Sequence, residues 1–291
     1  MKINERDVFN IIKSTRKYAL SIDVTSGRSF GQHQSVYEGH SREYRDRKEF
    51  IFGDDIKDID WKAFARTEKF YVKIFEGEHT LNIYLFVDFS NSMVFTTTKT
   101  SKLRYACLFA LSIAYIASLK NENFSMTAYA DKLLSYTPLA SGKRQFSSVL
   151  HQINGVKCTI STSFYKTLSE IAPKLQKNAI SIIFSDVLED YDFENAIRLL
   201  RGLDHKIYLF NILDPSEIDP NLKGDLLIKD LESDRSIPLR LSDTVKEEYK
   251  KKFDIYFKKI HDICTTNKVI YERTTTTTPI ESHLVKYFYE I

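Results

Sequence analysis

From residue 82 onward, short β-rich apolar runs alternate with segments of helical periodicity, and this alternation restricts the fold more than any other feature of the chain. Strands that alternate with helices form a mostly parallel sheet with helices on both faces. The sequence therefore predicts a doubly wound, Rossmann-like α/β domain. Its strands are expected at 82–87, 124–130, 132–137, 179–184, 206–213 and 268–272, and its helices at 101–120, 146–154, 164–176, 193–203, 243–266 and 279–289.

The first 79 residues follow a different pattern. A helix is predicted at 5–18, and the chain after it is polar and irregular. We therefore expect residues 1–79 to form a helix and an irregular segment that pack on the main domain, which spans residues 80–291. Two short apolar runs that flank a polar turn, near residues 222–241, predict a small hairpin insertion. Trp61 is expected to be buried against the main domain.

Charge and cysteine content exclude several classes of protein. The chain has 42 basic and 39 acidic residues and a net charge of +3, without the excess of a dedicated nucleic-acid binder. Its three cysteines, Cys107, Cys158 and Cys264, form no CxxC pattern, which argues against a disulfide framework or a zinc site. No signal peptide is visible, and the longest nearly apolar stretch, 107–117, is short of the about 20 residues of a membrane span. We expect a cytoplasmic protein without a membrane span.

Oxygen-bearing side chains follow two of the predicted strands. Asp88, Ser90 and Ser92 form an Asp-x-Ser-x-Ser loop after the strand at 82–87, and Asp186 follows the strand at 179–184. Thr162 precedes a predicted helix between them. Ligands of open α/β sheets bind at the carboxyl ends of the strands, where these residues should meet. Hard divalent cations prefer such oxygen ligands, so we predict a site for Mg²⁺, with Mn²⁺ or Ca²⁺ as alternatives.

The same residues also have purely structural explanations. Asp and Ser are favoured in turns and at helix N-caps, so Asp88, Ser90 and Ser92 could form a capping loop. Thr162 could cap the helix that follows it, and Asp186 could cap a turn. The sequence contains no nucleophile elbow, P-loop or GxGxxG motif, and we assign no catalytic and no cofactor-binding residue.

The metal site has a counterpart in a known family of domains. Asp88-x-Ser90-x-Ser92, Thr162 and Asp186 resemble the metal-ion-dependent adhesion site of von Willebrand factor A domains. This resemblance implies a doubly wound fold. It also implies a metal ion that bridges to an acidic side chain on a partner protein.

A second resemblance rests on motifs upstream of that loop. Glu-Tyr-Arg at 43–45, Gly-Asp-Asp at 53–55, Trp-Lys-Ala-Phe-Ala-Arg at 61–66 and the segment 72–78 occur in an order that resembles the bacterial domain of unknown function 58 family. The resemblance covers roughly residues 28–290 and implies association with a MoxR-type AAA+ ATPase. One departure is Thr162-Ser163-Phe164, where relatives often have Thr-Asp-Leu.

Three functions remain open from the sequence. The first is a non-enzymatic, metal-dependent interaction module that binds a MoxR-type ATPase, or the client of that ATPase, with a chaperone-like role in the assembly or maturation of protein complexes. The second is a Mg²⁺-dependent phosphohydrolase that uses Asp88 as nucleophile, although Ser90 stands where a second carboxylate would be needed. The third is a structural adaptor with a vestigial metal site.

Overall fold

The computed structural model describes residues 2–26, 43–51, 59–67, 69–76, 80–159, 161–188, 192–220, 224–229, 236–241 and 243–288. The chain divides into two units. The larger unit combines Met1–Gly27 with Leu81–Ile291, and the smaller unit is Arg28–Thr80.

The larger unit is built on a six-stranded sheet with the strand order β10-β7-β6-β3-β4-β5. The strands β3, β4, β6, β7 and β10 are parallel, and only β5 runs antiparallel, as the partner of β4. The predicted doubly wound, mostly parallel α/β fold is therefore confirmed. The strands are β3 (Asn82–Asp88), β4 (Asn123–Tyr129), β5 (Leu133–Tyr136), β6 (Ile180–Ser185), β7 (Lys206–Leu213) and β10 (Ile270–Thr275).

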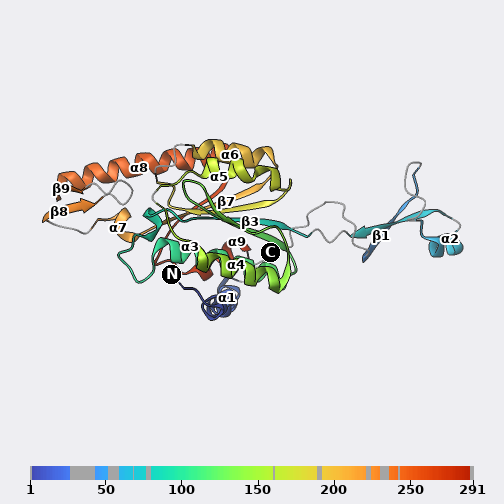
Figure 1. Cartoon of the computed structure of the whole chain (residues 1–291). Coiled ribbons are helices and arrows are strands. Elements are labelled where there is room, and N and C mark those ends of the chain that lie inside the picture. Colours follow the sequence, from blue (N-terminus) through green and yellow to red (C-terminus); the bar gives the residue numbers. More distant parts are fainter. Residues whose placement is uncertain are drawn as a thin grey trace. The chain divides into compact units, whose positions relative to one another are not determined.

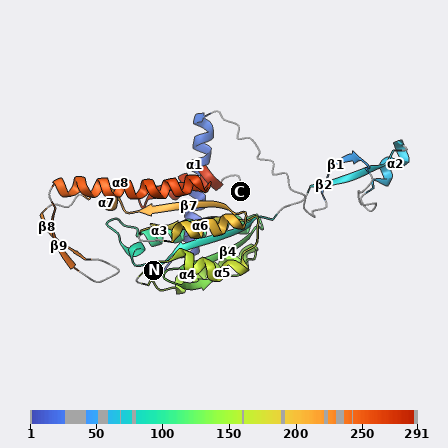
Figure 2. The ribbon, with the colours of Figure 1, turned by 90° about the horizontal axis from the view of Figure 1, so that it is seen from above.

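Helices cover both faces of this sheet (Figures 1 and 2). The alternation of apolar residues along β3 explains why both faces are buried: Ile83 and Leu85 join one core cluster, and Tyr84 and Phe86 join the other. On the first face lie α1 (Glu5–Ser26), α3 (Lys102–Leu119), α4 (Gly142–Gly155) and α9 (Ile280–Phe288), and on the second lie α5 (Phe164–Ile171), η3 (Ala172–Lys174), α6 (Phe193–Gly202) and α8 (Asp243–Thr266).

The helix α3 lies at the centre of the first core cluster. Its Phe109 ring makes edge contacts with Phe184 and Phe210, at centroid distances of 5.2 and 4.6 Å. Within the described residues, α3 is the one helix that is long and apolar enough to cross a membrane by length and composition. Because 72% of its apolar window is buried inside the protein, α3 is explained as a core helix.

The connection after β7 carries the predicted hairpin. The short helix α7 (Pro215–Ile218) begins with a capping box, in which Asp214 accepts from Ser216 N and Glu217 Oε2 accepts from Asp214 N at 2.7 Å. The antiparallel pair β8 (Gly224–Lys229) and β9 (Ser236–Leu241) follows and leads into α8. Sequence analysis did not predict α7.

The helix α1 belongs to the sheet unit. Its start is fixed by Ile3, whose backbone N–H donates to Asn154 Oδ1 at 2.8 Å and whose carbonyl accepts from Asn154 Nδ2 at 2.9 Å. Ile3 and Val8 are buried in the first core cluster. The helix, at Glu5–Ser26, is longer than the predicted 5–18. It belongs to the larger unit, whereas Arg28–Thr80 forms the smaller one, so the predicted N-terminal segment 1–79 is divided between the two units.

The smaller unit has more regular structure than the sequence indicated. It contains the antiparallel strands β1 (Glu43–Glu49) and β2 (Tyr71–Glu76) and the helix α2 (Trp61–Thr67). Asp60 Oδ1 caps α2 by accepting from Lys62 N and Ala63 N, both at 3.0 Å. Within this unit the Trp61 ring contacts the edge of Phe64 and is 58% exposed, and its expected packing against the main domain stays a prediction.

Candidate metal centre at the carboxyl ends of the strands

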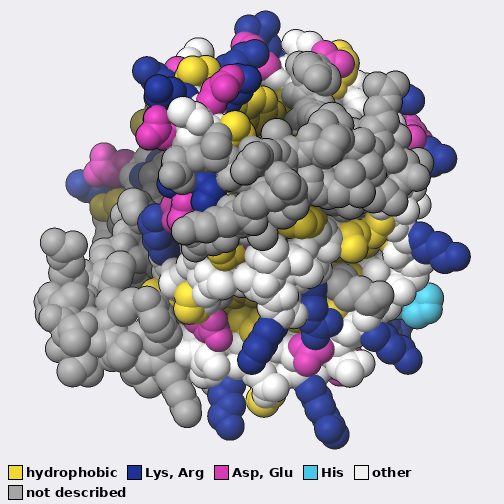
Figure 3. All heavy atoms as spheres, turned by 90° about the vertical axis from the view of Figure 1, so that its left-hand side faces the viewer, with side chains coloured by type: hydrophobic (Ala, Val, Ile, Leu, Met, Phe, Trp, Pro, Cys, Tyr) yellow, Lys and Arg dark blue, Asp and Glu magenta, His cyan; other side chains and the backbone are white. Residues whose placement is uncertain are grey.

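The predicted site residues lie where the central strands of the sheet end. Strands β3 and β6 are direct neighbours, so Asp88 at the end of β3 and Ser185 and Asp186 at the end of β6 come to the same edge. Figure 3 faces this edge, where the described surface is mostly uncharged polar side chains and backbone between scattered charged side chains. A loop that includes η2 (Ser92–Val94) connects β3 to α3.

Three hydroxyl groups and one carboxylate form the first half of the site. Ser90 Oγ lies 2.9 Å from Ser92 Oγ, and Thr162 Oγ1 donates to Asp88 Oδ2 at 3.3 Å. Asp88 and Ser90 are fully buried, whereas Ser92 and Thr162 are half-buried and border the solvent. The structure therefore brings four of the five predicted ligands together.

Backbone hydrogen bonds hold the two loops of this half in place. Phe89 N donates to Tyr129 O at 2.7 Å, and Asn91 N donates to Thr159 O at 2.9 Å. Thr159 N in turn donates to Phe89 O, so the segment before Thr162 extends the sheet pattern beyond the end of β3. Ser90 N closes a tight turn on Asp88 Oδ1 at 2.8 Å, which is a favoured conformation for an Asp-x-Ser sequence.

The surroundings of Asp88 disfavour the ionised form of its carboxyl group. Burial, and after it the negative charge of Asp186, raise the pKa of Asp88 to about 7, although hydrogen bonds from Ser90 and Ser185 act in the opposite direction. Ser185 donates its hydroxyl to Asp88 Oδ2 at 2.8 Å. Both Asp88 oxygens therefore accept hydrogen bonds: Oδ1 from Ser90 N, and Oδ2 from the hydroxyls of Thr162 and Ser185. These bonds fix the orientation of the carboxylate.

Asp186 forms the second half of the site and faces a different partner. Its Oδ2 accepts from Lys102 Nζ at 2.8 Å, and its Oδ1 accepts from Leu188 N at 3.3 Å. Lys102 also contacts Glu217 Oε1 at 2.5 Å, and the side chains of Lys102 and Asp186 are both fully buried. Burial alone lowers the pKa of Lys102, but the two carboxylates raise it overall above its ordinary value.

Lys102 and Glu217 are site residues that sequence reasoning missed. Lys102 lies in the first turn of α3, directly after the N-cap Ser101. A positive charge is unfavourable at the N-terminus of a helix, so this position indicates a lysine that is stabilised by an acidic partner. The capping-box spacing of Asp214 and Glu217 was equally readable.

The backbone next to Asp186 is strained. Val187 has φ of 54°, in the left-handed region that β-branched residues rarely adopt. Its N–H donates to Ser185 Oγ at 2.9 Å, and its carbonyl accepts from Tyr256 OH of α8. These contacts maintain a conformation that costs about 1–3 kcal/mol and that directs Asp186 toward α3.

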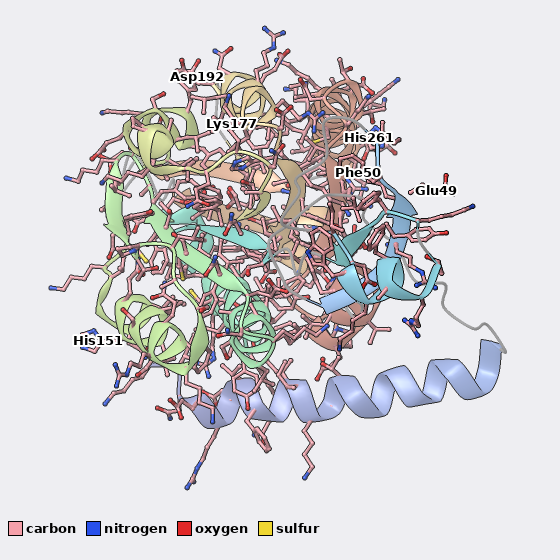
Figure 4. The ribbon with its side chains drawn as sticks, turned by 90° about the vertical axis from the view of Figure 1, so that its right-hand side faces the viewer. Glu49, Phe50, His151, Lys177, Asp192 and His261 are labelled. Atoms are coloured by element: carbon pink, nitrogen blue, oxygen red, sulfur yellow. The ribbon has the colours of Figure 1, made fainter. Side chains whose placement is uncertain are left out.

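The donor set fits a hard divalent cation. Mg²⁺ binds oxygen at about 2.0–2.1 Å in octahedral geometry, which places neighbouring ligands about 3 Å apart. The 2.9 Å between the hydroxyls of Ser90 and Ser92 matches this spacing. In the described part of the chain, no group of three or more His, Cys, Asp or Glu side chains could hold a metal. Figure 4 accordingly shows His151 on α4 and His261 on α8 far apart, on opposite sides of the sheet.

A doubly wound α/β domain with an oxygen-lined site at the carboxyl edge of its sheet is the class of protein that the fold and the site define. Within that class, the model of the family described as "Protein of unknown function DUF58" matches residues 43–255. The chain belongs to this family, as its motifs predicted.

Curated relatives with similar sequences are uncharacterized proteins of Mycobacterium tuberculosis and Mycobacterium bovis. Each is 22% identical over 210 residues, which cover 70% of this chain and 65% of the relative. The chain thus spans slightly under two thirds of the length of these relatives.

Solved structures with a similar fold include von Willebrand A-type domains. BatB from Bacteroides thetaiotaomicron has a TM-score of 0.47 at 14% identity, covering 71% of this chain and 96% of BatB. The VWA domain of SpRpn10 has a TM-score of 0.41 at 12% identity, covering 73% and 97%. An aerotolerance-related membrane protein from Bacteroides fragilis has a TM-score of 0.44 at 13% identity, covering 72% and 100%. These likenesses concern the fold alone.

The comparison corrects the expected cytoplasmic location. One of the matched chains is named as a membrane protein, which contradicts a location that was inferred from the lack of a visible signal peptide and of a long apolar stretch. Apolar runs report membrane spans within the chain itself and say nothing of attachment through another protein, so they could not establish a compartment.

Proposed function

We propose that this chain is a metal-dependent protein-interaction module. A divalent cation, Mg²⁺ first, would be held by the hydroxyls of Ser90, Ser92 and Thr162, with Asp88 and Asp186 acting through their charge and through bound water. The cation would present an open position to an acidic side chain of a partner protein. The partner we propose is a MoxR-type AAA+ ATPase or the client of that ATPase, in the assembly or maturation of a protein complex.

The hydroxyl cluster is the observation that supports this function. Both oxygens of Asp88 already accept hydrogen bonds, and both oxygens of Asp186 are bonded to Lys102 and Leu188. The hydroxyl oxygens of Ser90, Ser92 and Thr162 keep lone pairs for an ion, and Ser92 and Thr162 border the solvent. A cation held by neutral ligands keeps most of its charge, so it would attract a carboxylate from outside the chain.

Each site residue has a defined task in this proposal. Asp88 fixes the loop turn through Ser90 N and orients Thr162. The loop hydroxyls define where the ion is bound, and their half-buried edge leaves access from solvent. The bound cation would supply Lewis acidity toward an incoming carboxylate. The proposed ATPase partner is supported by the family resemblance of the upstream motifs, and ATP hydrolysis would belong to that partner.

Affinity capture from the source cell tests the proposal. Wild-type protein, Asp88→Ala and Thr162→Ala would be compared in Mg²⁺ and in EDTA, with Ser161→Ala as a matched control, because Ser161 is an exposed hydroxyl next to Thr162. We expect an AAA+ ATPase to be captured by the wild type and by Ser161→Ala in Mg²⁺ only. Equal capture in all conditions would reduce the metal site to a scaffold, and capture of no ATPase would contradict the proposed partner.

No observation favours either alternative function. A phosphohydrolase that uses Asp88 would need an acid two residues later, and that position is the buried Ser90. A phosphatase assay with Mg²⁺ tests this alternative directly. For the vestigial adaptor, Asp88→Ala should change neither partner capture nor stability.

A further inference from the structure

Lys102 is the one described cation that is fully buried beside the candidate metal centre. It comes from the first turn of α3 and bridges two carboxylates that lie 84 and 115 residues later in the chain. A buried ion pair of this kind is not a simple source of stability, because the desolvation of its charges offsets much of their attraction. We therefore asked what the pair does to the site.

The position of Lys102 determines which way Asp186 can act. Asp186 directly follows Ser185, whose hydroxyl donates to Asp88 Oδ2 at 2.8 Å, so the two acids lie in one site at the ends of the neighbouring strands β3 and β6. Yet the Asp186 carboxylate is bonded on one oxygen by Lys102 and on the other by Leu188 N. The negative charge of Asp186 is thus compensated by Lys102 of the same chain, and its carboxylate faces α3.

Resting on the proposed function, we propose that Lys102 is the specificity-determining residue of the metal centre: it keeps Asp186 from coordinating the cation directly, so that the cation is held firmly only together with an anionic group from a partner. The chain itself then supplies hydroxyls and too little uncompensated negative charge. A carboxylate of the partner supplies the negative charge that Asp186, paired with Lys102, does not offer to the cation.

The ion pair between Lys102 and Glu217 allows a test of the role of Lys102 that conserves the net charge. Lys102→Met alone would leave two carboxylates unpaired, but Lys102→Met with Glu217→Gln removes one charge of each sign and keeps the net charge of the wild type. Glu217→Gln alone is the matched control, because it retains the bond between Lys102 and Asp186. A glutamine at this position can still accept from Asp214 N, so the capping box of α7 is preserved.

The measured quantity is the affinity for Mn²⁺ alone, by calorimetry or electron paramagnetic resonance. The double variant should bind Mn²⁺ at least about tenfold more tightly than the wild type, because a nearby positive charge is removed and Asp186 is released. Glu217→Gln should bind no more tightly than the wild type. Adding Asp186→Asn to the double variant should abolish the gain. A double variant without tighter binding, or a gain that survives Asp186→Asn, would overturn the proposal.

A second measurement needs no variant to fold. At equal free Mn²⁺, acetate as a simple carboxylate should raise the Mn²⁺ affinity of the wild type relative to chloride, and an unchanged affinity would count against the role of Lys102. The proposed function fails separately: it is contradicted if neither the wild type nor the double variant binds Mn²⁺. If Ser92→Ala abolishes Mn²⁺ binding but the double variant binds no more tightly, only the inference about Lys102 fails.

Discussion

Replacing Asp88 with asparagine should remove a pH-dependent destabilisation of the folded protein. Burial and then the charge of Asp186 raise the pKa of Asp88 from 3.8 to about 7. A group whose pKa is higher in the folded state contributes stability that is fully present below its unfolded pKa and is lost as the pH rises through its folded pKa. For Asp88, this loss falls between about pH 4 and pH 7.

The size of the effect follows from the pKa difference. A rise of about 3 units at 1.36 kcal/mol per unit corresponds to roughly 4 kcal/mol of stability that is absent at pH 8. Between pH 5 and pH 8 the wild type should lose roughly 2–3 kcal/mol from this group. Asparagine carries no charge, and the hydroxyl of Ser185 or Thr162 can rotate to accept from its amide, so Asp88→Asn should fold.

Urea unfolding in EDTA at pH 5 and at pH 8 measures the free energy of unfolding. Relative to the wild type, Asp88→Asn should be more stable at pH 8 than at pH 5 by about 2–3 kcal/mol. Asp254→Asn, which changes an exposed carboxyl group on α8, is the control and should show no such difference. Excess Mg²⁺ at pH 8 should stabilise the wild type but not Asp88→Asn. The reasoning is refuted if the two proteins differ by the same amount at both pH values.

Three further substitutions separate the site from the scaffold. Asp186→Ala should weaken Mn²⁺ binding by at least about tenfold, because it leaves Lys102 with one carboxylate fewer, while the circular dichroism spectrum stays unchanged; wild-type affinity in calorimetry would contradict the assignment of Asp186. Trp61→Ala should lower the free energy of unfolding by under about 1 kcal/mol, because the smaller unit by itself leaves the ring 58% exposed. A loss of about 3–5 kcal/mol would instead show that the ring packs against the main domain. Phe109→Ala should lower the free energy of unfolding by about 3–5 kcal/mol, because this ring of α3 is fully buried against rings of β6, β7 and α9. Equal melting temperatures of the Trp61→Ala and Phe109→Ala variants would contradict the assigned core.

The alternation of β-rich apolar runs with segments of helical periodicity was sufficient to predict the sheet domain. Strands such as 82–87 and 206–213 are buried on both faces and read as continuous apolar runs, so sequence analysis located them within about one residue. The smaller unit was missed because β1, with the sequence Glu-Tyr-Arg-Asp-Arg-Lys-Glu, has no apolar alternation. Its strand conformation depends on pairing with β2 and not on its own pattern.

The site was predictable where a short spacing, or a position just after a strand or just before a helix, marked its residues. The spacing of Asp88, Ser90 and Ser92 indicates one loop, and the loop proved to carry the hydroxyl pair. The place of Lys102 in the first turn of α3 indicated an acidic partner, but which acid it meets depends on how α3 packs against the ends of β6 and β7, and no local pattern contains that packing. For that reason sequence analysis grouped Asp186 with the hydroxyls and overlooked the lysine that faces it.

The site has one half with three hydroxyls and the Asp88 carboxylate, and a second half in which Lys102 compensates the charge of Asp186. This division has a thermodynamic consequence. If the cation needs an outside carboxylate, then metal and carboxylate must each raise the affinity for the other by the same factor. The factor by which acetate tightens Mn²⁺ binding should therefore equal the factor by which Mn²⁺ tightens acetate binding. In the variant that combines Lys102→Met with Glu217→Gln, both factors should shrink together, because Asp186 would then occupy the position that the carboxylate fills. A factor of one in the wild type would mean that Mn²⁺ and acetate bind independently and do not share one site.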